Sequence, residues 1–479
     1  MKTNDMMEGY AYWREYPERD TEYVRWYPCV VGPVSEKEVW KKKPLAFYIH
    51  IPFCNNVCHC CLYNKFNTKG SLVINYIEAL KKEILNYASR HYIQENEFIT
   101  GYLGGGTPTA LTTAQLKDLL AFMFKHLNIK KDAHITIETT PLDIDEEKAS
   151  MLLEQGVNRV SIGVQSFDDD LLRNIGRIHT GEKAKQVISM LRKTGYKEIG
   201  VDLMYGLPGQ TLEKWKKTID ELIALKVESV SFYFYILIPS SPLFMKVKEG
   251  KVPSIPSQEV IDELYDYAIN KLLSAGYVAA STNDFGSDSG IEDKKWEDIG
   301  VKVYPLGPEG YRGVMVPTFP RTVYLTHAWY NCGELLAVGS GAYGYIKDYT
   351  YINEPDIEKY IRRCNDSELP LSMGAYVSPE ERMARNMVIG IKLLKILRSD
   401  FKDRYGVDFT QVFGRQIKEL EEQGLVKLTD EALEVTYPKG WSYMDNISKA
   451  FYSDLNYRMP QPSPTNTNIL KFLKRKEEK

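Results

Sequence analysis

The sequence predicts an α/β protein whose main part is a partial (β/α)6 barrel of the TIM-like kind. Three observations lead to this prediction. From residue 45 onward, short runs rich in β-forming residues alternate with longer stretches of helical periodicity. Six such strand–helix units follow one another, which favours a parallel sheet with right-handed crossovers. Six units rather than eight leave a barrel open, and a length of 479 residues leaves room for further segments.

The predicted strands are short apolar runs rich in Val, Ile, Leu, Phe and Tyr. The first of them ends at Pro52, which has no backbone N–H to donate to a sheet. Each run is followed by a loop that opens a helical stretch. We expect strands at residues 45–51, 98–103, 134–138, 159–164, 198–204 and 229–236.

The helical stretches between these strands carry apolar residues every three or four positions, as Ile77, Leu80 and Ile84 do. Thr112 or Thr113 is expected to cap the second helix, because a hydroxyl can accept a hydrogen bond from the first turn. We expect helices at residues 73–92, 113–127, 168–175, 182–194, 212–225 and 257–276, and a further one that begins near Asp145.

The segments around the barrel, residues 45–282, have different patterns. Residues 1–44 are rich in aromatic residues and interrupted by prolines, so we expect an irregular N-terminal arm packed on the barrel. We expect residues 283–378 to form an insert after the barrel. Its first part, 283–323, is rich in Gly and Pro among acidic residues, and we expect an irregular substrate lid there. Residues 379–479 are expected to form an accessory domain.

The accessory domain is expected to be mainly α-helical. A helix is predicted over 379–397, where Met383, Met387, Ile391 and Leu394 would share one face. Residues 408–454 indicate helices and a short hairpin, as in a winged-helix module. That stretch is more acidic than basic between Lys418 and Glu434, so we expect a structural cap rather than a DNA-binding surface.

Composition narrows the class of protein. The net charge of −3 gives no general reason to expect nucleic acid or an anionic membrane as a partner. No apolar run approaches the length of a membrane span, and the N-terminus lacks an apolar secretory core. We therefore expect a cytoplasmic protein, a monomer, that acts on a small-molecule substrate.

Three cysteines follow the first strand at close spacing. Cys54, Cys58 and Cys61 lie in a short polar loop. Three thiolates can bind three irons of a [4Fe–4S] cluster and leave the fourth iron open to a chelating small molecule. Cys60 lies beside the third position, and spacing alone would also permit it as a ligand. Adjacent side chains differ in direction, so we expect only one of Cys60 and Cys61 to bind the cluster.

Spacing alone also leaves a zinc site and a disulfide framework open for these cysteines. Zinc sites usually combine two Cys or His pairs, and no second pair follows downstream. A disulfide framework is disfavoured because the chain holds only 7 cysteines in 479 residues. The spacing favours an iron–sulfur cluster over both.

The loops that follow the predicted strands each carry a chemically unusual group. Such loops build the active sites of barrels. The second strand is followed by consecutive glycines, which let a ligand approach the backbone closely. The fifth strand contains an acid among apolar residues, which is costly unless it is paired; a salt bridge to Arg177 is the structural alternative for it. These groups are Gly104–Thr109, Glu138, Gln165, Arg177 and Asp202.

Together with the cysteine loop, these motifs resemble the HemN-type radical S-adenosylmethionine (SAM) family. The likeness runs from about residue 45 to 240 and resumes at 338–344. That family includes oxygen-independent coproporphyrinogen III dehydrogenases, haem chaperones, anaerobic haem-degrading enzymes, and enzymes that use two SAM molecules for methylation or cyclopropane formation. The resemblance implies reductive cleavage of SAM at a [4Fe–4S] cluster to a 5′-deoxyadenosyl radical, with an electron donor such as flavodoxin or ferredoxin.

The resemblance also implies roles for individual residues. It assigns the cluster to Cys54, Cys58 and Cys61, and it places Cys60 beside the SAM adenine. Further residues match positions that contact the cluster-bound SAM, namely Tyr48, Gly105, Gly106, Thr107 and Glu138. Others match positions that contact a second SAM or lie near the two nucleosides, namely Gln165, Arg177, Asp202, Ile236 and Tyr343.

The chain departs from the dehydrogenases at several points. Tyr63 stands where they carry a fourth Cys, and Cys60 stands where an aromatic residue is usual. The segment Tyr23–Pro28 replaces their N-terminal signature, and the insert 283–323 suggests another substrate. From these departures we expect a second SAM that donates a methyl or methylene group to a small or aromatic substrate. The alternatives are a tetrapyrrole-acting enzyme, for haem degradation or coproporphyrinogen oxidation, and a haem chaperone.

Overall fold

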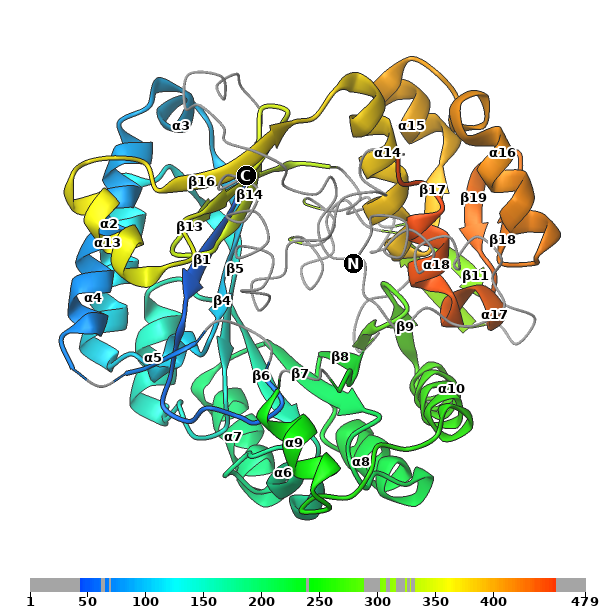
Figure 1. The fold of residues 1–479 in the computed structure, drawn as a ribbon, viewed down its shortest axis with the longest axis horizontal. Helices are drawn as coiled ribbons and strands as arrows, with labels where there is room; N and C mark the ends of the chain where they lie inside the picture. The colour runs from blue at the N-terminus through cyan, green and yellow to red at the C-terminus, as the bar shows by residue number, and fades with distance from the viewer. Residues whose placement is uncertain are drawn as a thin grey trace, which may run out of the picture.

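The computed structural model describes residues 44–61, 65–68, 70–237, 241–287 and 332–453, with Tyr324, Ala328 and the backbone of two further strands. The predicted N-terminal arm up to residue 43, Tyr63 and residues 454–479 lie outside the described residues. Within the described part, 14 strands form one sheet in the order β11-β12-β9-β10-β8-β7-β6-β5-β4-β1-β13-β14-β15-β16. Figure 1 shows helices α2, α4, α5, α7, α8 and α10 around the outside of this sheet.

The six predicted strands are all present and lie next to one another in parallel, which confirms the partial barrel. A seventh parallel strand, β13, pairs with the free side of β1. The predicted end of the sixth strand was wrong, because β8 ends at Phe234 and Ile236 lies beyond it. The strands are β1 (Leu45–Ile51), β4 (Phe98–Gly105), β5 (Ile129–Thr139), β6 (Arg159–Gln165), β7 (Glu198–Tyr205), β8 (Ser229–Phe234) and β13 (Glu334–Val338).

Helices connect successive strands, and most begin at a residue whose side chain caps the first turn. Thr112 and Gln115 form a reciprocal capping pair at the start of α4, as expected for that position. The helices of the barrel are α2 (Leu72–Ala88), α3 (His91–Glu95), α4 (Thr113–His126), α5 (Glu146–Glu154), α6 (Asp169–Asn174), α7 (Gly181–Thr194), α8 (Leu212–Ala224), α9 (Pro242–Lys248) and α10 (Gln258–Ser274).

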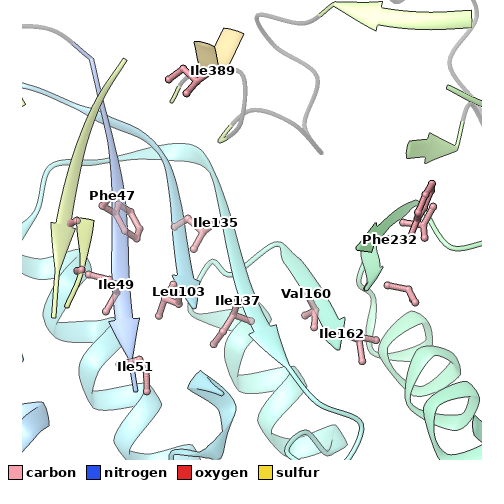
Figure 2. Close-up of a cluster of buried hydrophobic side chains, with 14 of the residues drawn as sticks. Phe47, Ile49, Ile51, Leu103, Ile135, Ile137, Val160, Ile162, Phe232 and Ile389 are labelled. Atoms are coloured by element: carbon pink, nitrogen blue, oxygen red, sulfur yellow. The ribbon is translucent and has the colours of Figure 1, made fainter. Parts of the chain in front are cut away.

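The two faces of the sheet differ because side chains alternate along a strand. One face is apolar and packs against the helices; Figure 2 shows part of it, including Leu103, Ile135, Ile137, Val160 and Ile162. We call the other the inner face. In-register pairing places the alternate residues there, and they are largely polar: Tyr48, Tyr102, Thr136, Glu138, Arg159, Ser161, Asp202, Ser229 and Ser231.

The insert after residue 283 is more regular than predicted. Its first residues belong to β10 (Asp284–Ser287), which pairs with β8 and with β9 (Tyr277–Ala279). A hairpin of β11 (Lys302–Leu306) and β12 (Tyr311–Met315) extends the sheet from there. The prediction of an irregular segment was therefore wrong for these residues. They form strands that pair with neighbouring strands, despite the nearby glycines. The rest of 288–323 lies outside the described residues.

At the opposite edge of the sheet, β13 leads into three antiparallel strands, with one helix between the second and the third. These elements are β14 (Tyr343–Ile346), β15 (Tyr349–Asn353), α13 (Ile357–Asn365) and β16 (Leu371–Tyr376).

The accessory domain corrects one predicted helix. α14 ends at Gly390, and Leu394 adopts a left-handed conformation with φ of 72°, so the expected helix over 379–397 stops short. The chain then enters β17, which pairs with β19 in a small three-stranded sheet. The domain contains α14 (Pro379–Gly390), β17 (Lys395–Leu397), α15 (Arg398–Tyr405), α16 (Phe409–Glu422), β18 (Val426–Leu428), β19 (Ala432–Val435), α17 (Lys439–Ser442) and α18 (Met444–Lys449).

Candidate functional site

The cysteine loop begins in β2 (Phe53–Cys54) and runs towards β3 (Phe66–Asn67). Cys54, Cys58 and Cys60 are buried, with exposed fractions of 7%, 8% and 7%, whereas Cys61 is half-buried. The loop is therefore not a solvated turn; it presents thiols to the interior of the molecule.

Backbone contacts hold this loop against the glycine loop that follows β4. The N–H of Gly106 donates to the Ile51 carbonyl at 2.8 Å, and the N–H of Thr107 donates to the Phe53 carbonyl at 2.7 Å. A β-carbon on Gly106 would lie 2.7 Å from the Phe53 oxygen, so only glycine fits. The Thr107 hydroxyl lies 3.5 Å from the Cys54 sulfur, which places Thr107 beside a predicted ligand.

A lysine that the sequence analysis did not single out closes the other end of the loop. Lys65 Nζ donates to the Cys61 carbonyl at 2.8 Å and to the Cys58 carbonyl at 3.4 Å. Its charge also acts against the rise in pKa that burial causes at Cys54 and Cys58. Lysine after a cysteine run is common on protein surfaces, so its spacing alone gave no signal.

Glu138 lies at the end of β5 on the inner face, where it accepts two hydrogen bonds. The Tyr102 hydroxyl donates to Oε1 at 2.9 Å, and the Gly105 N–H donates to Oε2 at 3.1 Å. Burial raises the pKa of Glu138, and both hydrogen bonds oppose that rise. The predicted SAM contacts Gly105 and Glu138 are thus brought together by a direct bond.

Gln165 ends β6 in a left-handed conformation, with φ of 68°. Such a backbone is unusual for a residue with a side chain and is often found at functional sites. The amide folds back over Gly163: a β-carbon there would lie 2.9 Å from Gln165 Nε2 and 3.5 Å from Arg177 Nη2. The structure therefore brings Gln165 and Arg177 together at the end of β6.

Arg177 faces the cysteine loop as well as Gln165. Burial raises the pKa of Cys58, and the positive charge of Arg177 is the largest influence that opposes this rise. The chain around Arg177 is tied to the loop, because Asn56 donates to the Gly176 carbonyl at 3.1 Å and the His59 N–H donates to the Ile175 carbonyl at 3.0 Å.

Asp202 lies on the inner face of β7 and does not pair with Arg177. Its carboxylate accepts from the Ser161 hydroxyl at 3.3 Å and 3.4 Å, and no ion pair of Asp202 occurs among the described residues. Burial, with the charge of Glu138, raises the pKa of Asp202 to about 7, and the charge of Arg159 opposes this. The structural salt bridge that we considered for Asp202 is therefore not formed.

Three other predicted contacts occupy different places. Tyr48 stacks on Tyr102 with ring centroids 6.3 Å apart, which puts it on the inner face beside Glu138. Ile236 is half-buried beyond the end of β8. Tyr343 is buried on β14 in a small cluster with Ile352 and Met373. The roles of Ile236 and Tyr343 beside a nucleoside stay predictions.

Comparisons with known proteins identify the class. A model of the radical SAM superfamily matches residues 48–222, and a model of the HemN C-terminal domain matches residues 377–443. The heme chaperone HemW of Bacillus subtilis is 30% identical over 410 residues, which is 85% of this chain and 99% of that protein. The oxygen-independent coproporphyrinogen III oxidase of Pseudomonas aeruginosa is 30% identical over 400 residues, 82% of each chain.

The fold agrees with these relatives. The structure of coproporphyrinogen III oxidase (HemN) from Escherichia coli matches with a TM-score of 0.74 and 23% identity, over 91% of this chain and 98% of that one. The chain therefore belongs to the HemN/HemW family of radical SAM proteins. Membership implies a [4Fe–4S] cluster and SAM as cofactors.

The residues present fit a cluster by their chemistry. Within the described residues, no group of three or more Cys, His, Asp or Glu side chains is arranged around a single metal ion. A [4Fe–4S] cluster does not require that, because each thiolate binds a different iron. Burial, with smaller contributions from the charges of Cys61 and Cys58, raises the pKa of Cys54 to about 11, so the three thiols are close enough to interact electrostatically. Cationic iron would remove that cost by binding the thiolates.

Cys54, Cys58 and Cys61 would hold the cluster, and Glu138 with Gly105 would meet SAM. Bound there, the two cofactors supply the one-electron chemistry of the family. This chain's own contribution is to bury the cysteine loop and to orient the Glu138 and Asp202 carboxylates through hydrogen bonds. Among the residues the structure describes, no helix combines the length and hydropathy needed to cross a membrane.

Proposed function

We propose that this protein handles a tetrapyrrole, with haem as its first candidate ligand and SAM bound at the cysteine loop. One observation carries the proposal: the named relatives that match this chain from the barrel through the accessory domain are a heme chaperone and coproporphyrinogen oxidases. The chain covers 99% of HemW, so no domain of that relative is missing here. None of these relatives is a methyltransferase, and the comparisons give no support to the methyl or methylene transfer that we expected.

The inner face offers a surface that suits a flat ring system. Tyr48, Tyr102 and Tyr324 form a row, with ring centroids 6.3 Å and 5.3 Å apart, beside the Glu138 carboxylate. Aromatic faces stack well on large planar ligands. Tyr63 replaces the fourth Cys of the dehydrogenases, so within this proposal haem ranks ahead of coproporphyrinogen.

Two further parts of the proposal concern cofactors and partners. Gln165, Arg177 and Asp202 would bind a second SAM or part of the tetrapyrrole, since they are polar, clustered at neighbouring strand ends and lie beyond Glu138. A flavodoxin or ferredoxin would deliver the electron that reductive cleavage of SAM requires.

The test uses full-length protein reconstituted anaerobically with iron and sulfide. Haem is titrated in and its absorption band followed, and SAM cleavage is then measured with a reductant, in the presence of haem, of coproporphyrinogen III or of neither. We expect stoichiometric haem binding that Tyr324→Leu weakens, because the Tyr324 ring packs against the Tyr102 ring in the proposed surface. Tyr376→Leu is the matched control, since that ring is 56% exposed on β16.

The products of SAM cleavage distinguish the candidate functions within the family. Haem binding without haem-dependent 5′-deoxyadenosine supports a chaperone, and haem-dependent 5′-deoxyadenosine with haem loss supports degradation. S-adenosylhomocysteine formed from SAM as a non-tetrapyrrole substrate is methylated would restore the methyl-transfer prediction. If neither tetrapyrrole binds or stimulates SAM cleavage, the proposal is wrong.

A further inference from the structure

Arg159 is a buried cation on the inner face that the sequence analysis did not single out. It is the first residue of β6 and only 8% exposed. Its Nη2 donates to the Ser229 hydroxyl on β8 at 3.1 Å, so the side chain crosses the intervening strand β7. Its Nε lacks a hydrogen-bond partner, and Arg159 makes no ion pair within the described part of the chain. A buried guanidinium without a bonded anion is costly, and so it calls for a compensating role.

Gly200 makes this crossing possible. A β-carbon on Gly200 would lie 2.4 Å from Arg159 Nη2 and 3.1 Å from its Cζ, so any side chain at that position would displace the guanidinium. The register places Gly200 beside Ser161, and Ser161 beside Glu138. The guanidinium therefore occupies the layer of the inner face that contains Glu138.

The same geometry places the guanidinium next to Asp202. Gly200 and Asp202 are two residues apart on β7 and point to the same face, which separates them by roughly 7 Å along the strand. The guanidinium thus lies beside Gly200, two residues before Asp202 on β7 and farther from the carboxyl end of the strand. Its charge lowers the pKa of both Asp202 and Glu138, against the effect of burial.

We propose that Arg159 is a positioning residue whose buried charge favours the ionised form of the Glu138 and Asp202 carboxylates, so that they accept hydrogen bonds from the ammonium or ribose hydroxyl groups of SAM. Without that charge, two buried carboxylates at the strand ends would repel each other and take up protons. The inference rests on the SAM-binding part of the proposed function and is independent of the tetrapyrrole.

The neighbouring titratable groups do not obscure the effect. Tyr102 on β4 stays uncharged, because burial raises its pKa far above the usual range. His134 on β5 stays neutral, because burial and the charge of Arg159 lower its pKa to about 3. Asp284 on β10 is held by the Ser231 and Ser281 hydroxyls at 2.6 Å and 2.7 Å and acts on Asp202 as a second negative charge.

The test measures SAM binding rather than turnover. Full-length protein, reconstituted with its cluster under anaerobic conditions, is titrated with SAM in a calorimeter at several values of pH. For Arg159→Met we expect the apparent pKa that governs SAM binding to rise by about one unit or more, with affinity about tenfold weaker near neutral pH and recovered at higher pH. Arg159→Lys should bind as the wild type does, since it restores the charge.

Two further variants keep the test decisive if Arg159→Met fails to fold. Gly200→Ala displaces the guanidinium while leaving it in the chain, and it should raise the same apparent pKa. Arg192→Met is the matched control, because that side chain is 41% exposed on α7 and binds Glu228 away from the inner face. If the wild-type protein binds no SAM, the proposed SAM site is wrong, whatever the role of Arg159. Equal weakening at every pH, or failure of Arg159→Lys to restore binding, would show a purely structural role and overturn the inference.

Discussion

Gln165 lies directly above Gly163 on the inner face, with its side-chain nitrogen 2.9 Å from the place that a β-carbon on Gly163 would occupy. This contact explains two features at once. The left-handed backbone of Gln165 turns its amide back over the sheet, and the missing side chain at Gly163 provides the space. Arg177 lies beside the same position, so one glycine fixes the spacing of two predicted ligand contacts.

Gly163→Ala is therefore expected to weaken ligand binding at the end of β6. The added methyl would displace the Gln165 amide, whose Nε2 is the flexible end of its side chain, while Arg177 Nη2 at 3.5 Å would stay at an ordinary contact distance. Calorimetric titration with SAM should show a lower affinity or a lower stoichiometry. Gly414→Ala is the control: it lies in α16 with open space around its β-carbon position, and it should leave binding unchanged. If Gly163→Ala binds SAM as tightly as the control variant, Gln165 does not contact the ligand.

The cysteine assignment is tested by iron content. Cys54→Ala, Cys58→Ala and Cys61→Ala should each lose cluster iron and the EPR signal of the reduced cluster, because each removes a thiolate from one iron. Cys60→Ala should keep both. Cys364→Ala serves as the matched control, since Cys364 is buried in α13 within the hydrophobic core. Loss of iron in Cys60→Ala with retention in Cys61→Ala would move the third ligand by one residue.

Gly106→Ala is expected to disrupt the packing of the glycine loop against the backbone that leads into the cysteine loop. Its β-carbon would lie 2.7 Å, 2.8 Å and 2.9 Å from backbone atoms of Phe53 and Ile51, which cannot rotate away as a side chain can. We expect destabilisation of about 1–3 kcal/mol and faster loss of iron to a chelator. Thermal unfolding measures the loss of stability, and the absorbance of the iron–chelator complex over time measures the loss of iron. A variant with unchanged melting temperature and iron retention would contradict the packing described here.

Glu83 makes stability depend on pH. It is fully buried in α2, where Gly339, Tyr360 and Asn353 donate to it, and burial raises its pKa from 4.5 to about 7. The folded state thus binds this proton more tightly than the unfolded state, so the contribution of Glu83 is fullest below pH 4.5 and is lost as the pH rises to about 7.

In denaturant titrations, wild type should lose roughly 2 kcal/mol more stability than Glu83→Gln between about pH 5.5 and pH 8. The variant also carries a constant, pH-independent penalty if its amide nitrogen meets the Asn353 side chain, so the slope rather than the offset is the readout. Parallel pH profiles for the two proteins would show that Glu83 does not titrate in this range.

The sequence by itself determined the order of strands and helices, the cysteine loop and most of the strand-end residues. Alternating apolar residues and local caps such as Thr112 are short-range signals, and they survive without knowledge of the fold. Predictions from these short-range signals were wrong where contacts between distant parts of the chain decide the structure. The helix predicted through Leu394 ends at Gly390 because β17 pairs with β19, and the supposed irregular insert begins as β10 because β8 offers it a partner.

Only the tertiary structure decided which charges meet. The sequence left a salt bridge to Arg177 open as the structural alternative for Asp202, yet in the fold the cation that acts on Asp202 is Arg159. That relationship depends on register across three strands and on the space that Gly200 leaves empty, neither of which local sequence encodes. Electrostatic interactions fall with distance in space rather than along the chain, so the partners of a buried charge appear only once the sheet is assembled.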